Sequence, residues 1–212
     1  RQFNTSGTGQ TGSKIVTMPI AVSGSNRILT QSGSTVSEGD VNLSSNGSYL
    51  TVVGYDAVPG TLTIATSATA ADVVGRLDAS GTINTSSYFN RSSVFSGASC
   101  RSACTFNGSA FWVAGAANGV QYITLGTTNS GLNTISNTFT NLRTINIFNN
   151  QLYVSSGGAG LRLGSVGTGL PITSGQITTN LSGFPNATND PYAYLFLDRS
   201  SIINGVDVVY VA

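Results

Sequence analysis

The sequence predicts an all-β protein, a β-propeller or partial propeller built from four-stranded antiparallel blades. Strong helix formers are scarce, whereas β-branched and aromatic residues are abundant. Short apolar or alternating runs are separated by Gly, Asn or Ser turns about every 8 to 12 residues, which is typical of sandwiches, barrels and propellers. A weak internal repeat of forty or more residues favours the propeller, because one blade has about that length. We therefore expect residues 1–212 to form a single propeller-like domain.

Residues 1–14 are expected to form a flexible or turn segment, although Gly7 to Lys14 matches the GxGxxG pattern. A nucleotide-binding glycine loop needs a helix after it, so that helix amides face the phosphates. Ile15 to Ile20 is instead β-branched, contains Pro19 and is expected to form a strand. The sequence therefore predicts no cofactor-binding residues at this motif.

Asn-Gly pairs mark hairpin turns, because both residues tolerate positive φ. Such pairs precede expected strands at Ser48 to Val53, Ala110 to Ala114 and Val120 to Leu125. A further hairpin is expected over residues 72–85, around the turn Ala79 to Gly81.

Four turn-and-strand units resemble one another and define the internal repeat. They are Asn46 to Gly54, Asn107 to Gly115, Asn149 to Gly157 and a degraded copy from Asn204 to Ala212. Their anchor residues lie 41 to 61 residues apart and are Leu50, Phe111, Leu152 and Val209. The last copy reads as a buried strand without a closing turn. We therefore expect more of the domain beyond Ala212, or partner chains that complete the fold.

Four segments of the chain carry a family resemblance. They are Arg101 to Gly126, Asn146 to Val154, Gly164 to Pro171 and Gly183 to Ala212. They resemble a group of secreted, propeller-like proteins from bacteria and from mosses or algae, over about Ala21 to Ala212. That group is functionally uncharacterised. The resemblance therefore implies the fold and an extracellular setting, and it supplies no catalytic residues.

Charge and histidine content exclude several classes of function. The chain has nine Lys or Arg, eight Asp or Glu, no His and a net charge of +1. Without a basic patch we expect no nucleic-acid partner. No apolar run approaches the roughly 18 residues that span a bilayer, so no membrane span is expected. Because His is the usual general base and metal ligand, we predict no catalytic residues, no cofactor and no metal, and a protein that is not an enzyme.

Two carboxylates are the strongest candidates for chemistry. Glu38 and Asp40 project from the same side of an extended segment, about 7 Å apart. Such a pair suits glycoside hydrolysis, and its oxygens suit calcium. The alternative, which we favour, is a solvated strand edge.

Aromatic side chains are candidates for stacking on sugar rings. Trp112 lies in Phe111 to Ala114, a run apolar on both faces, and is expected in the core. Tyr55, Tyr88 and Tyr192 lie nearer to loops and are better ligand candidates.

Cys100 and Cys104 are the only cysteines. In a straight strand their Cα atoms would lie about 13 Å apart, beyond the roughly 7 Å limit for a disulfide. A turn or bulge near Gly97 and Ser99 would bring them together, and an extracellular setting favours bridges. We predict a small disulfide loop, with two buried thiols as the alternative.

Eight N-x-S/T sequons occur, in expected turns that suit glycosylation in a eukaryotic secretory pathway. They are Asn4, Asn42, Asn46, Asn84, Asn90, Asn107, Asn180 and Asn186.

Repeated strands, the missing catalytic set and an uncharged polar surface together favour a secreted, non-enzymatic structural, adhesive or surface-assembly propeller. We expect glycosylation, self-association or binding to other extracellular proteins and glycans, and formation of filaments or matrix. A carbohydrate-binding, lectin-like propeller is the first alternative, and a carboxylate-dependent glycosidase or lyase is the second.

Overall fold

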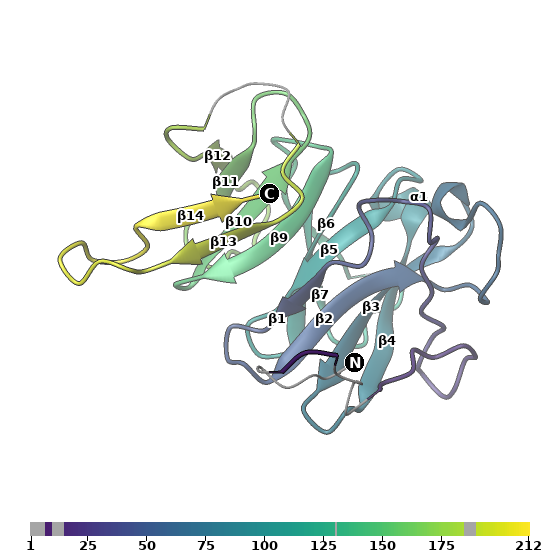
Figure 1. The fold of residues 1–212 in the computed structure, drawn as a ribbon. Coiled ribbons are helices and arrows are strands. Elements are labelled where there is room, and N and C mark those ends of the chain that lie inside the picture. Colours follow the sequence, from purple (N-terminus) through teal and green to yellow (C-terminus); the bar gives the residue numbers. More distant parts are fainter. Residues whose placement is uncertain (1–6, 10–14, 130, 185–189) are drawn as a thin grey trace.

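The computed structural model describes residues 7–9, 15–129, 131–184 and 190–212, coloured by position along the chain in Figure 1. These residues contain one short helix, α1 (Arg91–Val94), one 3-10 turn, η1 (Ile64–Thr66), and fourteen strands. The strands are β1 (Val41–Leu43), β2 (Tyr49–Tyr55), β3 (Ala71–Asp78), β4 (Ile83–Asn90), β5 (Cys100–Cys104), β6 (Ala110–Gly115), β7 (Val120–Thr124), β8 (Asn133–Ser136), β9 (Leu142–Phe148), β10 (Gln151–Ser156), β11 (Leu163–Val166), β12 (Thr178–Asn180), β13 (Tyr194–Leu197) and β14 (Val208–Val211). The predicted all-β class is confirmed for the described chain.

The strands form four antiparallel sheets in chain order. Sheet 1 is β1–β4, sheet 2 is β5–β8, sheet 3 is β9–β12, and sheet 4 is the two-stranded β13–β14. Within each sheet every strand pairs with the one before it, so that each sheet is a simple meander. Among the described residues these sheets close into neither a barrel nor a ring.

Each sheet packs face to face on the next one. Figure 1 shows the order in space, from blue β2 through teal β5 and β6 to green β9 and yellow β13. The core between sheets 1 and 2 includes Val53, Phe89 and Phe111, and the core between sheets 2 and 3 includes Trp112 and Leu152. The molecule is therefore a series of stacked sheets with a separate apolar core at each interface.

The repeat predicted from the sequence has a structural counterpart. The four copies coincide with β2, β6, β10 and β14, which are the second strands of the four sheets. Asn118 and Gly119 join β6 to β7 with φ of 54° and 67°, as a type I′ hairpin turn requires. The hairpin expected over residues 72–85 is present as β3 and β4.

Ile15 to Ile20 does not form the predicted strand. Pro19 has no N–H for a ladder, and its carbonyl instead accepts a hydrogen bond from the Leu29 amide at 3.0 Å. Most of the expected flexible segment, residues 1–14, lies outside the described residues.

Candidate functional site

The first strands of sheets 1, 2 and 3 are joined by a network of polar side chains centred on Asn42. Asn42 is 5% exposed, and its Nδ2 donates to Ser102 Oγ at 3.2 Å, to the Ala103 carbonyl at 3.0 Å and to the Ile145 carbonyl at 3.3 Å. Its Oδ1 accepts from Asn146 Nδ2 at 2.9 Å. Strands in different sheets share no backbone ladder, so this one amide links β1 to both β5 and β9.

Asp40 belongs to the same network. Its Oδ2 accepts from Ser102 Oγ at 2.5 Å and from Asn42 Nδ2 at 3.0 Å. Ser102 Oγ also accepts from the Ile145 amide at 3.0 Å. Burial raises the pKa of Asp40, and the hydrogen bonds from Ser102, Asn42 and Thr144 oppose that rise. The Asp40 carboxylate is therefore engaged in connecting sheets.

Glu38 is held by a second set of donors. Its Oε2 accepts from the Ser32 amide at 2.7 Å and from Ser32 Oγ at 2.9 Å, and its Oε1 accepts from the Tyr55 hydroxyl at 2.5 Å. Burial raises the pKa of Tyr55, and the hydrogen bond to Glu38 raises it further. Both carboxylate oxygens of Glu38 are thus occupied by the protein itself.

Glu38 and Asp40 line one small pocket of about 170 Å³. The solvated strand edge that we favoured is wrong, because both residues are half-buried and lie outside the strands. Arg143 and Tyr192 line it too. Arg143 is ion-paired with Asp190 and lies 4.8 Å from the centre of the Tyr192 ring. The guanidinium opposes binding of a cation beside these carboxylates. In the described part of the chain, no group of three or more His, Cys, Asp or Glu side chains could hold a metal ion.

A buried ion pair that the sequence patterns did not single out lies close to this region. Arg91 and Asp72 are both 0% exposed, with Nη2 to Oδ1 at 3.1 Å. Arg91 Nη1 also donates to the carbonyls of Ile64, Ala65 and Ser67, and the guanidinium lies 4.5 Å from the centre of the Tyr55 ring. Burial raises the pKa of Asp72 to about 7, although Arg91 lowers it. The sequence feature that could have indicated this pair is the charged Asp72 directly before the apolar Val73 and Val74.

The predicted disulfide is wrong, because the two thiols are free. Both cysteines lie on β5, which bulges between Cys100 and Ser102. One extra residue reverses the side-chain alternation, so Cys100 enters the core with sheet 1 and Cys104 the core with sheet 3. The bulge expected from the sequence is present, and it turns the two sulfur atoms to opposite faces of the sheet.

The described sequons fall into two structural classes. In Asn46, Asn84, Asn90 and Asn107 the side-chain Oδ1 accepts from the amide two residues later, at 2.8 to 3.1 Å. These side chains form Asx-turns and are exposed or half-buried. Asn42 is buried, while Asn180 is half-buried and its Oδ1 accepts from the Arg162 amide. Asn4 and Asn186 lie outside the described residues.

The aromatic candidates differ in their exposure to solvent. Trp112 is 4% exposed in the core, as expected, and its Nε1 donates to the Pro171 carbonyl at 2.7 Å. Tyr55 is 1% exposed, so the expectation that it is open to a ligand is wrong. Tyr88 lies under Arg27 at 4.7 Å, and Tyr192 lies under Arg143.

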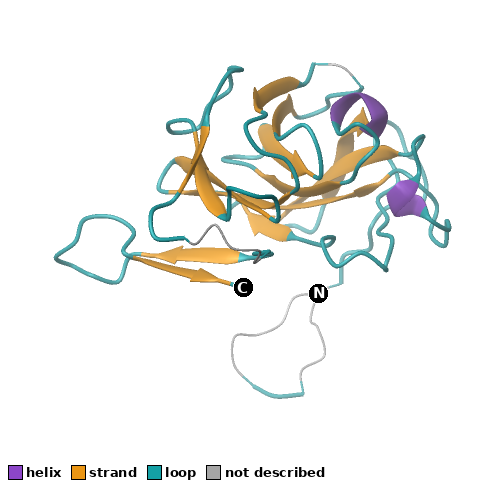
Figure 2. Ribbon diagram, turned by 90° about the horizontal axis from the view of Figure 1, so that it is seen from above, coloured by secondary structure: helices purple, strands orange, loops and turns teal. Residues whose placement is uncertain are grey.

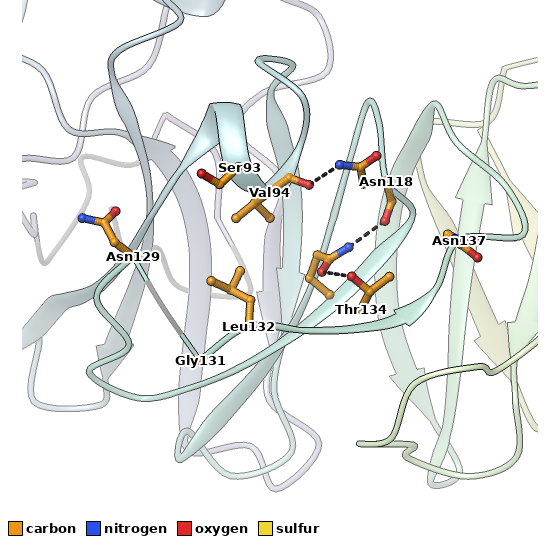
Figure 3. A pocket seen from close by; sticks show the side chains of 9 residues that line it. Ser93, Val94, Asn118, Asn129, Gly131, Leu132, Thr134 and Asn137 are labelled. Carbon is orange, nitrogen blue, oxygen red and sulfur yellow. Dashed lines mark hydrogen bonds between the residues drawn. The ribbon is translucent and has the colours of Figure 1, made fainter.

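A second pocket, of about 370 Å³, has no charged lining residue and is shown in Figure 3. It lies between α1, the turn joining β6 to β7, and β8. Asn118 Nδ2 donates to the Val94 carbonyl at 2.7 Å, and Gln121 is fixed between the Asn118 carbonyl and the Thr134 hydroxyl. Asn129 and Asn137 stand at opposite sides of the pocket. The pocket therefore combines a hydrogen-bonded back wall with amides at its sides.

Comparison of the chain with protein-family models, with curated proteins and with solved structures finds no match. Among the described residues, no helix is long and apolar enough to cross a membrane.

Proposed function

We propose that the four sheets are blades of a β-propeller-type module. Two observations support this proposal. The chain forms three consecutive four-stranded meanders, and the first strand of each meander takes part in the polar network centred on Asn42. The second strand of every sheet carries the same sequence repeat. Sheet 4, with β13 and β14, is the two-stranded member of the series.

The function that we propose for this module is structural: a secreted, non-enzymatic protein that adheres or assembles at a surface. The observation that carries the proposal is the use of the candidate carboxylates. Glu38 and Asp40 line a small pocket, but they accept hydrogen bonds from Ser32, Tyr55, Asn42 and Ser102 and so connect elements of the fold. These contacts favour the structural function over the glycosidase alternative, which needs two available carboxyl groups.

The experiment that tests this function is isolation of the native particle from its source. We expect a particle heavier than the 21.7 kDa chain, composed of several copies or of this chain with other extracellular components. A native particle with the mass of one chain would contradict the assembly function. Polysaccharide cleavage that is lost in Asp40→Asn protein would contradict the non-enzymatic one.

A second candidate function, binding of an uncharged carbohydrate, is favoured by the pocket of Figure 3. Its amide and hydroxyl groups suit sugar hydroxyls, and Val94 and Leu132 supply apolar contact. We expect saturable binding of a neutral glycan on an array, weakened about tenfold in Asn137→Ala protein by loss of about 1.4 kcal/mol. Asn204→Ala, which changes an exposed amide in the loop joining β13 to β14, is the matched control. Equal binding by both variants would show that the carbohydrate does not bind in this pocket.

A further inference from the structure

The sheets stack according to one rule, which is visible in the second strands. In β6, Phe111 and Val113 pack back on sheet 1, while Trp112 and Ala114 pack forward on sheet 3. In β10, Leu152 and Val154 pack back on sheet 2. The same strand turns Tyr153 forward, 4.6 Å from Phe196 of sheet 4. Each sheet therefore has a backward face that contains the repeat anchor and a forward face that contains the residue after it.

The backward face of sheet 1 has no preceding sheet among the described residues. It contains Val41, Leu43 and Leu50, which are 56%, 58% and 37% exposed. Leu43 pairs with Leu50 across the strands, and Leu50 is the repeat equivalent of Phe111 and Leu152. An apolar groove of about 660 Å³ runs along this face, and Val16 and Met18 of the segment before β1 line part of it. Side chains that are buried in sheets 2 and 3 are thus open to solvent in sheet 1.

The forward face of sheet 4 is open in the same way. Leu195 and Tyr210 pair across β13 and β14 and are 49% and 54% exposed, whereas Tyr194 and Phe196 face sheet 3. Tyr210 is the repeat equivalent of Trp112 and Tyr153, the two aromatic residues that pack forward. Figure 2 shows this two-stranded sheet, which ends near the C label, extending from the rest of the molecule.

We propose that the forward face of sheet 4 packs on the backward face of sheet 1 of a second copy of this chain. The inference rests on the proposed assembly function and names its partner. The contact continues the rule that orders the sheets within the chain. It joins two different surfaces, so it is heterologous and closes into a ring where the rotation permits. Two copies supply eight sheets, which is within the usual four to eight blades of a propeller.

Charged side chains lie near the rims of both faces. Asp78 lines the groove on sheet 1, and hydrogen bonds from Ser80 and the Thr82 amide lower its pKa. Arg199 lies beside Tyr210, with Nη1 3.5 Å from the hydroxyl. Asp207 also lies beside Arg199, because its Oδ1 accepts from the Arg199 amide at 3.1 Å. The packing rule of the sheets, and not charge, therefore sets the expected orientation.

Three matched substitutions test the proposal. Leu43→Glu places a charge on the backward face, Leu195→Glu places one on the forward face, and Leu62→Glu changes a residue that is 87% exposed in the connection between β2 and β3. We expect purified wild-type and Leu62→Glu protein to have twice the 21.7 kDa chain mass by light scattering. Leu43→Glu and Leu195→Glu proteins are each expected to have the mass of one chain. Circular dichroism and thermal unfolding establish that all four proteins are folded.

A purified wild-type chain that is monomeric at every accessible concentration would overturn the proposal, as would assembly that either face variant leaves intact. Loss of assembly in only one face variant would indicate that like faces pair, and it would also overturn the proposal. Failure of this proposed contact can be distinguished from failure of the proposed assembly function. A monomeric purified chain together with a heavy native particle leaves the assembly function standing, with other proteins as partners.

Discussion

At the scale of single residues, several buried polar side chains each bind more than one partner. Arg91 is the clearest example, because one side chain contacts Asp72, three carbonyls and the Tyr55 ring. Removing one member of such a buried set leaves the others without partners, which costs more than the net value of the interaction.

We therefore expect Arg91→Leu to lower the free energy of unfolding by about 3–5 kcal/mol. Urea denaturation measures this change. The control is Arg199→Leu, at an exposed position, which should cost less than about 1 kcal/mol. Equal effects of the two substitutions would contradict the structural role of Arg91.

Asp72 makes stability depend on pH with a definite sign. Burial raises its pKa from 3.8 to about 7, so the folded state holds this proton more tightly than the unfolded state does. The contribution is fully present below pH 3.8 and is lost as the pH rises through about 7. Relative to Asp72→Asn protein, the wild type should lose stability between pH 5 and pH 8. A difference that stays constant over that window would contradict this account.

The sequons provide a third prediction at this scale. Asn42 Nδ2 is used inside the network, whereas the Asx-turns at Asn46, Asn84, Asn90 and Asn107 use only Oδ1. A glycan on Asn42 would therefore prevent folding. In protein secreted from a eukaryotic host, glycopeptide mapping should find Asn42 unmodified and the Asx-turn positions available. Recovery of folded protein with a glycan on Asn42 would refute the network.

At the scale of elements, the bulge in β5 decides the chemistry of both cysteines. It directs Cys100 and Cys104 into separate cores, and burial raises both thiol pKa values well above the usual range. Native protein should resist alkylation, because the thiolate is the reactive form. Protein unfolded without reductant should take up two labels by mass spectrometry. Uptake of none after unfolding would indicate a bridge.

The elements show how far sequence reasoning extends. The strands after Asn-Gly turns were predictable, because the turn residue and the apolar run both act locally. The direction of the β5 bulge was not, since it depends on how the strand pairs with β6. Asp72 and Arg91 were missed for the same reason: they lie 19 positions apart, and only the pairing of β3 with β4 brings them together.

At the scale of the whole molecule, the repeat predicted units of a turn and a strand, and the structure places each copy on the second strand of one sheet. It did not reveal that the carboxylates of Glu38 and Asp40 accept hydrogen bonds from other elements of the fold. Those contacts join residues up to 62 positions apart, as between Asp40 and Ser102, and no local pattern encodes them. The fold was therefore more predictable than the candidate site.

The central claim is that one forward-to-backward rule orders the sheets within a chain and between copies. Its most direct test is the light-scattering mass of an equimolar mixture of Leu43→Glu and Leu195→Glu proteins. Each variant keeps the face that the other has lost, so the mixture should form a particle of two chains, although neither variant assembles alone. A mixture that keeps the 21.7 kDa mass of one chain would contradict the claim.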